Sequence, residues 1–161
     1  MRYDYTADHL GSVCLELASA SRAATGFGAV LLRDATTLGS GRNRRSLPGE
    51  NELLGGGVDY ATHAEQSAIL DALSRGLDPS GADLYVLGIV NRGPNSGHLS
   101  VRATDDDVAF SCVRCAKTML KFDINVLIPL PSGWFKLSAR YALDTATEFR
   151  SAKRQRVFTE Q

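Results

Sequence analysis

DLYVLGIV, residues 83–90, is a nearly continuous apolar run, and it decides how the rest of the chain is interpreted. A strand with one buried face alternates apolar and polar side chains, because successive side chains point to opposite faces of the sheet. A strand covered on both faces needs no such alternation, and this run shows none. We therefore expect residues 83–90 to form an inner strand of a sheet that carries helices on both sides.

The segments around this strand alternate between helical and extended patterns. Amphipathic helices place apolar residues at spacings of three and four, and short strands are bounded by turn residues. We expect helices at residues 8–23, 62–75, 111–122 and 136–155, a hairpin of strands at 27–34 and 36–43, and another buried strand at 124–130. This order predicts an α/β fold, a three-layer α/β/α sandwich around a mixed central sheet of about five strands.

Two segments have no regular pattern. Residues 46–59, SLPGENELLGGGVD, are rich in glycine and proline and are expected to form a loop that ends at a helix cap, Thr62. Residues 91–110 are polar and rich in turn residues, with weak strand signals at 98–102 and 108–110. We interpret this second segment as an insertion at about residues 91–110.

Length and composition limit the class of protein. A chain of 161 residues, 43% apolar and 22% charged, fits one folded domain, so we expect a single domain over residues 1–161. No stretch approaches the ~20 apolar residues that span a membrane, and the first residues, MRYDYTADHL, lack the apolar centre of a secretory signal. We expect a cytoplasmic location and no membrane partner.

The charges balance, with 18 basic and 18 acidic residues, so the chain as a whole does not attract polynucleotide phosphates. Basic residues gather at Arg42, Arg44 and Arg45 and in a C-terminal tail at about residues 150–161. Such short runs usually form a solvated surface. A nucleic-acid partner is therefore the less favoured alternative to a small-molecule substrate.

Three cysteines are an odd number and a poor basis for a disulfide framework. Cys14 lies on the apolar side of the first expected helix and is interpreted as a small core residue. Cys112 and Cys115 form a C-x-x-C pair at the start of the third expected helix. In a reducing compartment such a pair indicates metal or redox chemistry.

A second motif, His63-Ala64-Glu65, stands at the start of the second expected helix. Two helix N-termini that face each other would bring one imidazole and two thiols together, and the positive ends of the helix dipoles would favour thiolates. Residues at i and i+3 share a helix face, so Cys112 and Cys115 can bind one ion. These two cysteines and His63 are candidate ligands of Zn²⁺, with a fourth position open for water. Glu65 lies beside them as a candidate proton carrier rather than a ligand.

On these motifs the chain resembles the zinc-dependent cytidine/deoxycytidylate deaminases, whose signature is H-x-E followed by P-C-x-x-C. THAE at 62–65 and SCVRC at 111–115 look like the two halves of that signature. GAVLLRD and LGSGRNRR resemble the first two strands of the family, and the resemblance spans about residues 8–130. It implies hydrolytic release of ammonia from a nucleobase-containing small molecule, by default a cytidine or deoxycytidine nucleoside or nucleotide.

The resemblance also implies a role for each site residue. His63, Cys112 and Cys115 would hold zinc, and the glutamate would pass a proton from water to the ring nitrogen and the departing amine. The catalytic residue is then Glu65. The substrate-binding groups would be the side chain of Asn43, the backbone N–H of Ala64 and the carbonyl of Ser111. Members of the family usually form dimers or tetramers, so a homo-oligomer is expected.

Two features depart from the family pattern. Ser111 stands where the family usually has proline before the first cysteine, so the helix start survives but the rigid turn is lost. The insertion at residues 91–110 lies where the family has a short connection, and we expect it to shape the substrate pocket or a subunit contact.

Other functions stay open on the sequence alone. The substrate could be a base in single-stranded DNA or RNA, guanine, or another aminated heterocycle, and Arg42, Arg44 or Arg45 near Asn43 could meet a phosphate. An alternative of another class is a non-catalytic zinc-binding assembly module. Glu65 disfavours that alternative, because a scaffold needs no proton carrier beside a metal.

Overall fold

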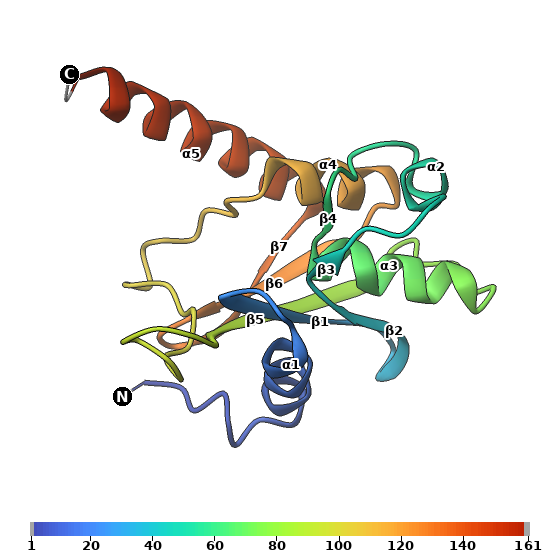
Figure 1. The fold of residues 1–161 in the computed structure, drawn as a ribbon, viewed down its shortest axis with the longest axis horizontal. Coiled ribbons are helices and arrows are strands. Elements are labelled where there is room, and N and C mark those ends of the chain that lie inside the picture. Colours follow the sequence, from blue (N-terminus) through green and yellow to red (C-terminus); the bar gives the residue numbers. More distant parts are fainter. Residues whose placement is uncertain (1, 160–161) are drawn as a thin grey trace.

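The computed structural model describes residues 2–159, with side chains up to residue 151. Its main sheet has five strands in the order β2-β1-β5-β6-β7 (Figure 1). The strands are β1 (Thr25–Arg33), β2 (Thr36–Arg42), β5 (Asp83–Val90), β6 (Asn125–Leu130) and β7 (Gly133–Leu137). β5 and β6 run parallel, and the other neighbouring strands run antiparallel. The predicted mixed sheet of about five strands is confirmed.

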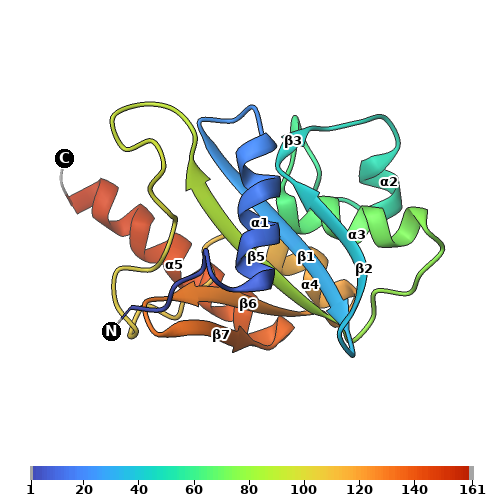
Figure 2. The same ribbon diagram turned by 90° about the horizontal axis from the view of Figure 1, so that it is seen from below.

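Helices cover both faces of this sheet (Figure 2). α1 (His9–Ala20) packs against β1 and β5 on one face, whereas α3 (Ala64–Ser74) packs against β1 and β2 on the other. α4 (Val113–Lys121) and α5 (Ala139–Thr159) pack on each other, and α5 contacts β6. The predicted three-layer α/β/α sandwich is confirmed.

The inner strand β5 is buried on both faces, as its apolar run predicts. Leu84 belongs to the large core between the sheet and α3, together with Ile69. Leu87, which points to the opposite face, belongs to the smaller core beneath α1, together with Cys14. Successive side chains of one strand therefore serve two cores, and Cys14 is a core residue as expected.

Two glycines of β2 let α3 lie close to the sheet. A Cβ atom at Gly39 would lie 2.3 Å from the carbonyl oxygen of Ala68, and one at Gly41 would lie 2.4 Å from the Oγ atom of Ser67. Any larger residue would push the helix away, since real Cβ atoms do not approach other atoms so closely. The close packing fixes the N-terminus of α3, where the H-x-E motif lies.

The strand β7 was not predicted from the sequence. Residues 133–137 pair antiparallel with β6 and follow a turn at residues 131–132, and the first residue of the strand, Gly133, has a φ of 134°. The last helix therefore begins at Ala139 rather than at residue 136. Pairing with the exposed edge of β6 overrides the weak helical spacing of this segment, because β-sheet formation depends strongly on context.

The segment before α3 is more ordered than a plain loop. It contains α2 (Glu50–Leu54) and a two-stranded ladder of β3 (Arg44–Arg45) and β4 (Ala61–Thr62). The N-cap of α3 is His63 rather than Thr62, because Thr62 still pairs in β4. Short contacts of this kind leave no periodic pattern in the sequence.

The segment of residues 91–110 is irregular, as expected, but its weak strand signals are wrong. Residues 108–110 form no strand, and residues 98–102 contribute a single bridge, from Leu99 to Ile89. α4 has Cys112 as its N-cap, one residue later than the expected start at Ser111.

None of the helices within residues 2–159 combines the length and the apolar character needed to cross a lipid bilayer. The basic tail expected at residues 150–161 continues α5 as far as Thr159. Apart from those of Arg150 and Ser151, its side chains lie outside the described residues.

Candidate active site

The H-x-E and C-x-x-C motifs meet at the N-termini of α3 and α4. His63 and Cys112 are the caps of these two helices. The Nδ1 atom of His63 lies 3.2 Å from the Sγ atom of Cys112 and 3.2 Å from that of Cys115. These three atoms and a carboxylate oxygen of Glu65 all lie within 4.8 Å of one another. The structure therefore brings together the four residues that the sequence singles out.

The donor set fits Zn²⁺. Zinc binds nitrogen at about 2.0 Å and sulfur at about 2.3 Å, which places tetrahedral N and S ligands ~3.5 Å apart. The separations between His63 and the two cysteines are close to this value. Thiolates and imidazole are also the ligands that zinc prefers. Among the residues that the structure describes, this is the one group of three or more His, Cys, Asp or Glu donors so arranged.

Hydrogen bonds within the cluster prepare one thiolate in advance. The thiol of Cys115 donates to Cys112 and lowers the pKa of Cys112 to about 4, and the backbone N–H of Cys115 donates to the same sulfur at 3.3 Å. The hydrogen bond with Cys112 in turn raises the pKa of His63. Burial raises the pKa of Cys115, so this thiol keeps its proton until a metal ion displaces it.

Glu65 lies in the first turn of α3 and is only 7% exposed. Burial raises the pKa of its carboxyl group, and the negative charge on Cys112 raises it further. A carboxyl with a raised pKa accepts and returns a proton more readily near neutral pH than a surface glutamate does. Its position and its environment therefore suit proton transfer.

Glu50, in α2, anchors the segment that leads to His63. Its carboxylate accepts two hydrogen bonds from the guanidinium of Arg44, at 2.8 and 2.7 Å. It also accepts from the backbone N–H of Leu47 at 2.6 Å and from the hydroxyl of Thr62 at 3.1 Å. The hydrogen bonds from Arg44 lower the pKa of Glu50, in spite of its burial. The residue before His63 is thus fixed by a buried carboxylate.

Sequence reasoning missed Glu50. A glutamate in a glycine-rich segment is normally a solvated residue, because carboxylates are rarely buried unless they are paired. The partner, Arg44, was interpreted as part of a surface cluster. No pattern along the chain indicates that these two side chains meet.

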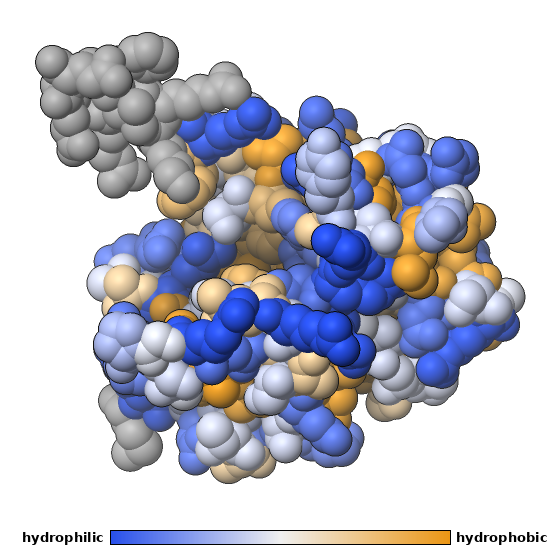
Figure 3. Space-filling view, in the orientation of Figure 1, coloured by the Kyte–Doolittle hydropathy of each residue, from blue (hydrophilic) through white to orange (hydrophobic). Residues whose placement is uncertain are grey.

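A cavity of about 460 Å³ lies beside the cluster. His63, Glu65 and Cys112 line it, and the remaining walls come mainly from β1, β5, the end of β6 and the segment of residues 100–111. In the space-filling view this side of the molecule is hollowed, with apolar surface inside and hydrophilic residues around it (Figure 3). The three expected substrate-binding residues, Asn43, Ala64 and Ser111, line this cavity as well.

Asn43 is held by the main chain of β1. Its Oδ1 atom accepts from the N–H of Phe27 at 2.8 Å, and its Nδ2 atom donates to the carbonyl of Thr25 at 3.1 Å. An amide group has two N–H bonds and two oxygen lone pairs, so one of each remains unused by these two hydrogen bonds. Asn43 is therefore both a structural residue and a rigidly oriented polar group of the pocket wall.

The arginine cluster of residues 42–45 does not reach the cavity. Arg44 is engaged with Glu50, and neither Arg42 nor Arg45 is among the lining residues. The expectation that one of them meets a substrate phosphate is not supported. The charged residues of the cavity wall outside the metal cluster are Arg102 and Asp107, both from the insertion. Sequence reasoning missed them because an irregular, polar segment does not show which of its side chains point inward.

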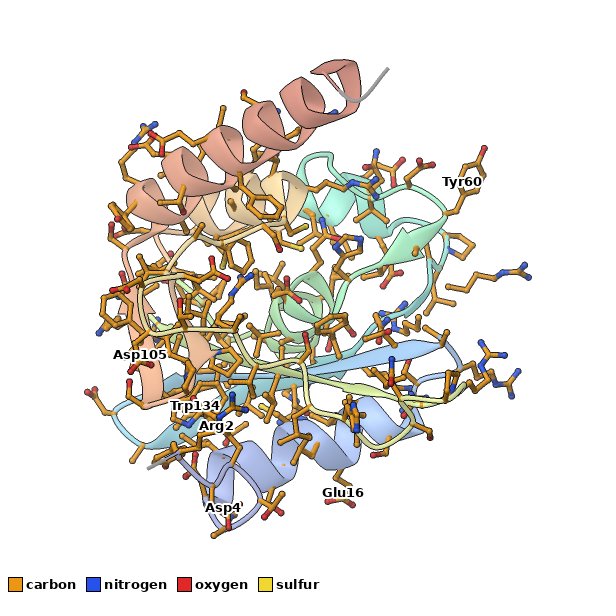
Figure 4. The ribbon with its side chains drawn as sticks, turned by 90° about the vertical axis from the view of Figure 1, so that its left-hand side faces the viewer. Arg2, Asp4, Glu16, Tyr60, Asp105 and Trp134 are labelled. Carbon is orange, nitrogen blue, oxygen red and sulfur yellow. The ribbon has the colours of Figure 1, made fainter. Side chains whose placement is uncertain are left out.

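Tyr60, three residues before His63, and His98, in the insertion, do not line the cavity. Tyr60 is 86% exposed and points away from the body of the molecule (Figure 4). His98 is exposed and does not line the cavity, in keeping with a solvated loop residue.

The solved structures described here are distant from this chain in sequence. No curated protein sequence matches the chain significantly. Among solved structures, the chain is similar to the dCMP deaminase from the cyanophage S-TIM5 in complex with dCMP and dUMP, with 16% identity and a TM-score of 0.44 over 78% of this chain and 81% of that one. For the apo form of the same enzyme the identity is 13% and the TM-score 0.39, over 76% and 74% of the two chains.

The family comparison covers most of the chain. The model of the cytidine and deoxycytidylate deaminase zinc-binding region matches residues 6–129, which include both motifs, the strands β1 to β5 and all of β6 except Leu130. The cluster of His63, Glu65, Cys112 and Cys115 fits the zinc site that the family name describes. The chain therefore belongs to the cytidine and deoxycytidylate deaminase zinc-binding family.

Proposed function

We propose that the protein is a zinc-dependent aminohydrolase that removes an amino group from a nucleobase-containing small molecule and releases ammonia. The default substrate is a cytidine or deoxycytidine nucleoside or nucleotide. One observation carries the proposal: a buried carboxyl group, Glu65, lies against a His/Cys/Cys donor set at the wall of a cavity. A structural zinc site has four protein ligands and needs no neighbouring proton carrier, whereas a catalytic site has three and leaves one position open.

In this proposal His63, Cys112 and Cys115 hold the zinc ion. Zinc bound by three protein ligands supplies a water molecule whose pKa is lowered to about 7, so that a nucleophile exists at neutral pH. The low pKa of Cys112 supports its role as a ligand, since it is the thiolate form that binds metal.

Glu65 moves the protons. Its carboxylate accepts one proton from water and delivers it to the ring nitrogen, while the remaining hydroxide bonds to the ring carbon that carries the amino group. Glu65 then transfers the proton of this new hydroxyl group to the amino group, and the carbon–nitrogen bond breaks to release ammonia. The hydroxyl oxygen replaces the amino group on the ring carbon, so water is consumed and no redox partner is needed. The burial that raises the pKa of Glu65 supports this double role, because the same group must both take up and release a proton.

Three further groups orient the ring. The backbone N–H of Ala64 lies in the first turn of α3, where N–H groups have no partner within the helix, and it can donate to the carbonyl of the ring. The carbonyl of Ser111 can accept from the amino group. Asn43, which keeps a spare donor and a spare acceptor, and Phe27 both line the same cavity.

The shape and charge of the site support a small molecule over a polynucleotide. A cavity of about 460 Å³ is of the size that encloses a small ligand. Its lining includes a single arginine and no lysine, whereas a nucleic-acid groove needs a track of basic residues.

The test is zinc content and ammonia release. Purified protein is expected to contain about one zinc ion per chain and to release ammonia from at least one member of a panel of cytosine, adenine and guanine bases, nucleosides and nucleotides. The matched control is Glu65→Gln, which keeps the shape of the side chain but cannot carry a proton. This variant is expected to retain zinc and to lose activity by about 10²- to 10⁴-fold, the usual contribution of a general acid–base group.

Two outcomes would contradict the proposal. Protein with bound zinc and no turnover of any compound, single-stranded oligonucleotides included, would favour an assembly module. Turnover confined to oligonucleotides would reject the small-molecule substrate. A single domain, a homo-oligomeric state and a cytoplasmic location stay predictions of the sequence.

A further inference from the structure

Gln66 is a buried polar side chain that the proposed reaction does not use. It lies in α3 directly after Glu65, and its side chain is fully buried. A buried carboxamide costs free energy unless hydrogen bonds replace those that water would provide. The partners of Gln66 therefore indicate what this side chain does.

Both ends of this carboxamide have partners. The Oε1 atom accepts from the backbone N–H of His63 at 3.3 Å, as in a capping box, where the third residue of a helix bonds back to the N-cap. The Nε2 atom donates to the carbonyl of Gly57 at 2.9 Å and to the hydroxyl of Thr118 at 3.4 Å. Only one orientation of the amide allows these bonds, because the N–H of His63 needs an acceptor and the carbonyl of Gly57 needs a donor.

Thr118 extends this network to the other helix of the metal cluster. Its hydroxyl accepts from Gln66 and donates at 3.2 Å to the carbonyl of Arg114, one residue before Cys115. A continuous chain of hydrogen bonds thus runs from the backbone of His63 to the first turn of α4. Thr118 is buried as well, and no buried side-chain N or O atom of the described residues lacks a partner. A buried network that is fully satisfied in this way is rigid.

The two helices that carry the metal cluster pack mainly on other elements. α3 packs mainly on β1 and β2, whereas α4 packs mainly on α5. Outside the metal cluster, the bond from Gln66 to Thr118 is the one hydrogen bond between side chains of α3 and α4 in the described part of the chain. A zinc site that takes ligands from both helix N-termini depends on their relative position, because its ligand distances tolerate only about 0.2 Å.

The glycine-rich segment before His63 joins the same network through the carbonyl of Gly57. Gly57 has a φ of 89°, and a Cβ atom there would lie 3.6 Å from the Nε2 atom of Gln66 and 3.7 Å from the Oγ1 atom of Thr118. The segment therefore lies against both helices. One side chain, Gln66, bonds to this segment, to His63 and to α4 at once.

We infer that Gln66 is a positioning residue of the zinc site. Its carboxamide holds the backbone of His63 and the first turns of α4 in the relative position in which one imidazole and two thiolates bind a single ion. The inference rests on the zinc site of the proposed function and not on the choice of substrate. A glutamine that merely filled the core would, when replaced, lower stability and leave metal binding unchanged.

The first experiment measures zinc affinity without turnover, by competition between the zinc-loaded protein and a coloured chelator. Gln66→Met keeps the length of the side chain but makes none of the three hydrogen bonds. It is expected to lower zinc affinity about 10- to 100-fold, the usual effect of removing a group that supports a metal ligand. The matched control is Ile69→Val, a buried change in the same helix outside the network, which is expected to keep zinc affinity within about twofold of the wild type.

Two variants of Thr118 separate the hydrogen bond from the volume of the side chain. Thr118→Val keeps the shape but loses the hydroxyl, and is expected to lower zinc affinity about 2- to 10-fold, the range of one hydrogen bond. Thr118→Ser keeps the hydroxyl and is expected to bind zinc as the wild type does. If Gln66→Met fails to fold, these two variants decide the matter, and equal zinc affinities in both would overturn the inference.

The second experiment reports the geometry of the site. The visible absorption bands of Co²⁺-loaded protein depend on how the ligands are arranged around the ion. These bands are expected to shift in Gln66→Met and to stay unchanged in Ile69→Val and Thr118→Ser, whatever each variant does to stability in urea.

Zinc affinity within about twofold of the wild type in Gln66→Met, with unchanged cobalt bands, would overturn the inference, while ammonia release by the wild type still upheld the proposed function. Zinc binding by the wild type without turnover of any compound would instead reject the proposed function, while a loss of zinc affinity in Gln66→Met upheld the inference.

Discussion

Two irregular segments lead to the metal donor set, and they are held in different ways. Residues 46–62 end at His63 and are organised around one buried carboxylate, Glu50, which bonds to Arg44, to the backbone of Leu47 and to Thr62. The segment also contains the short helix α2 and the strand β4, which pairs with β3. The side chains of Ser46, Glu50 and Thr62 bond to one another, so the segment serves to position His63.

Residues 91–111 end at Cys112 and are held mainly through the main chain. Backbone hydrogen bonds join residue 90 to 98, 100 to 88 and 102 to 129. Asn91 donates to carbonyls near the end of α1, but Arg102 and Asp107 form no ion pair with a described residue. The side chains of Arg102 and Asp107, which line the cavity, therefore stay available to a ligand.

Because the two segments are held in different ways, we expect them to have different tasks. A segment whose polar groups satisfy one another is rigid and cannot easily change without loss of stability. A segment fixed by its backbone can change its side chains while the fold is retained. We expect substitutions in the first segment to affect stability and substitutions in the second to affect substrate choice.

The largest effect is expected where both segments end. His63→Ala and Cys112→Ala should each lower zinc affinity by more than about 100-fold, because even the loss of a residue that supports a ligand costs 10- to 100-fold. Zinc content measured by elemental analysis checks this prediction. Comparable losses of zinc affinity in both variants would show that the two segments supply ligands to one ion. Retention of zinc in either variant would contradict this conclusion.

The next effect concerns stability. Glu50→Ala leaves the half-buried Arg44 without its partner and frees Thr62, so the free energy of unfolding should fall by about 2–3 kcal/mol. Glu52→Ala, an exposed position in the same helix, is the matched control and should change stability by less than about 0.5 kcal/mol. Chemical denaturation measures both. If Arg102→Gln lowered stability as much as Glu50→Ala does, the proposed division of tasks would fail.

A smaller effect is expected in acid. The folded protein holds the pKa of Glu50 below its unfolded value, so the stabilisation is fully present above the ordinary glutamate pKa of about 4.3 and is lost as the pH falls through the folded pKa. The gap in unfolding free energy between the wild type and Glu50→Gln should therefore narrow below about pH 4. Unfolding curves between pH 3 and pH 7 test this, with Glu52→Gln as the reference. A gap that stays constant over this range would contradict the assigned cause.

The smallest effect is expected for Ser111→Pro, which restores the residue that the family usually has before the first cysteine. Ser111 is exposed, and its backbone N–H donates to no described residue, so proline removes no hydrogen bond. Stability should change by less than about 0.5 kcal/mol and zinc content should stay the same, since a residue just before a helix tolerates proline. Thermal unfolding and metal analysis check both. Loss of zinc would show that the second segment is as tightly constrained as the first.

Much of the fold could be predicted from the sequence. The apolar run of β5, the hairpin of β1 and β2 and the spacing of α1 and α3 are local patterns, and local patterns reflect burial directly. The strand β7 could not be predicted in this way. It forms because the edge of β6 is available to pair with it, and no residue of the segment 133–137 carries that information.

The site, like the fold, has some parts that the sequence predicts and others that it does not. His63, Glu65, Cys112 and Cys115 stand out in the sequence because their types and spacings match metal ligands and a proton carrier. Asn43, Ala64 and Ser111 were selected through the family resemblance, and all three line the cavity. The structure does not support a phosphate contact by the arginines of residues 42–45, because Arg44 is paired with Glu50 and none of the three lines the cavity.

By itself, the sequence determined the chemistry of the donor set, the doubly buried strand and the family. Each depends on residue types at short spacings, where helix and strand geometry fix which side chains share a face. Only the tertiary structure decided that Arg44 pairs with Glu50 and that Arg102 faces the cavity. These outcomes depend on contacts between segments that the fold brings together, and a charged side chain acts on a ligand only when its neighbours leave it unpaired.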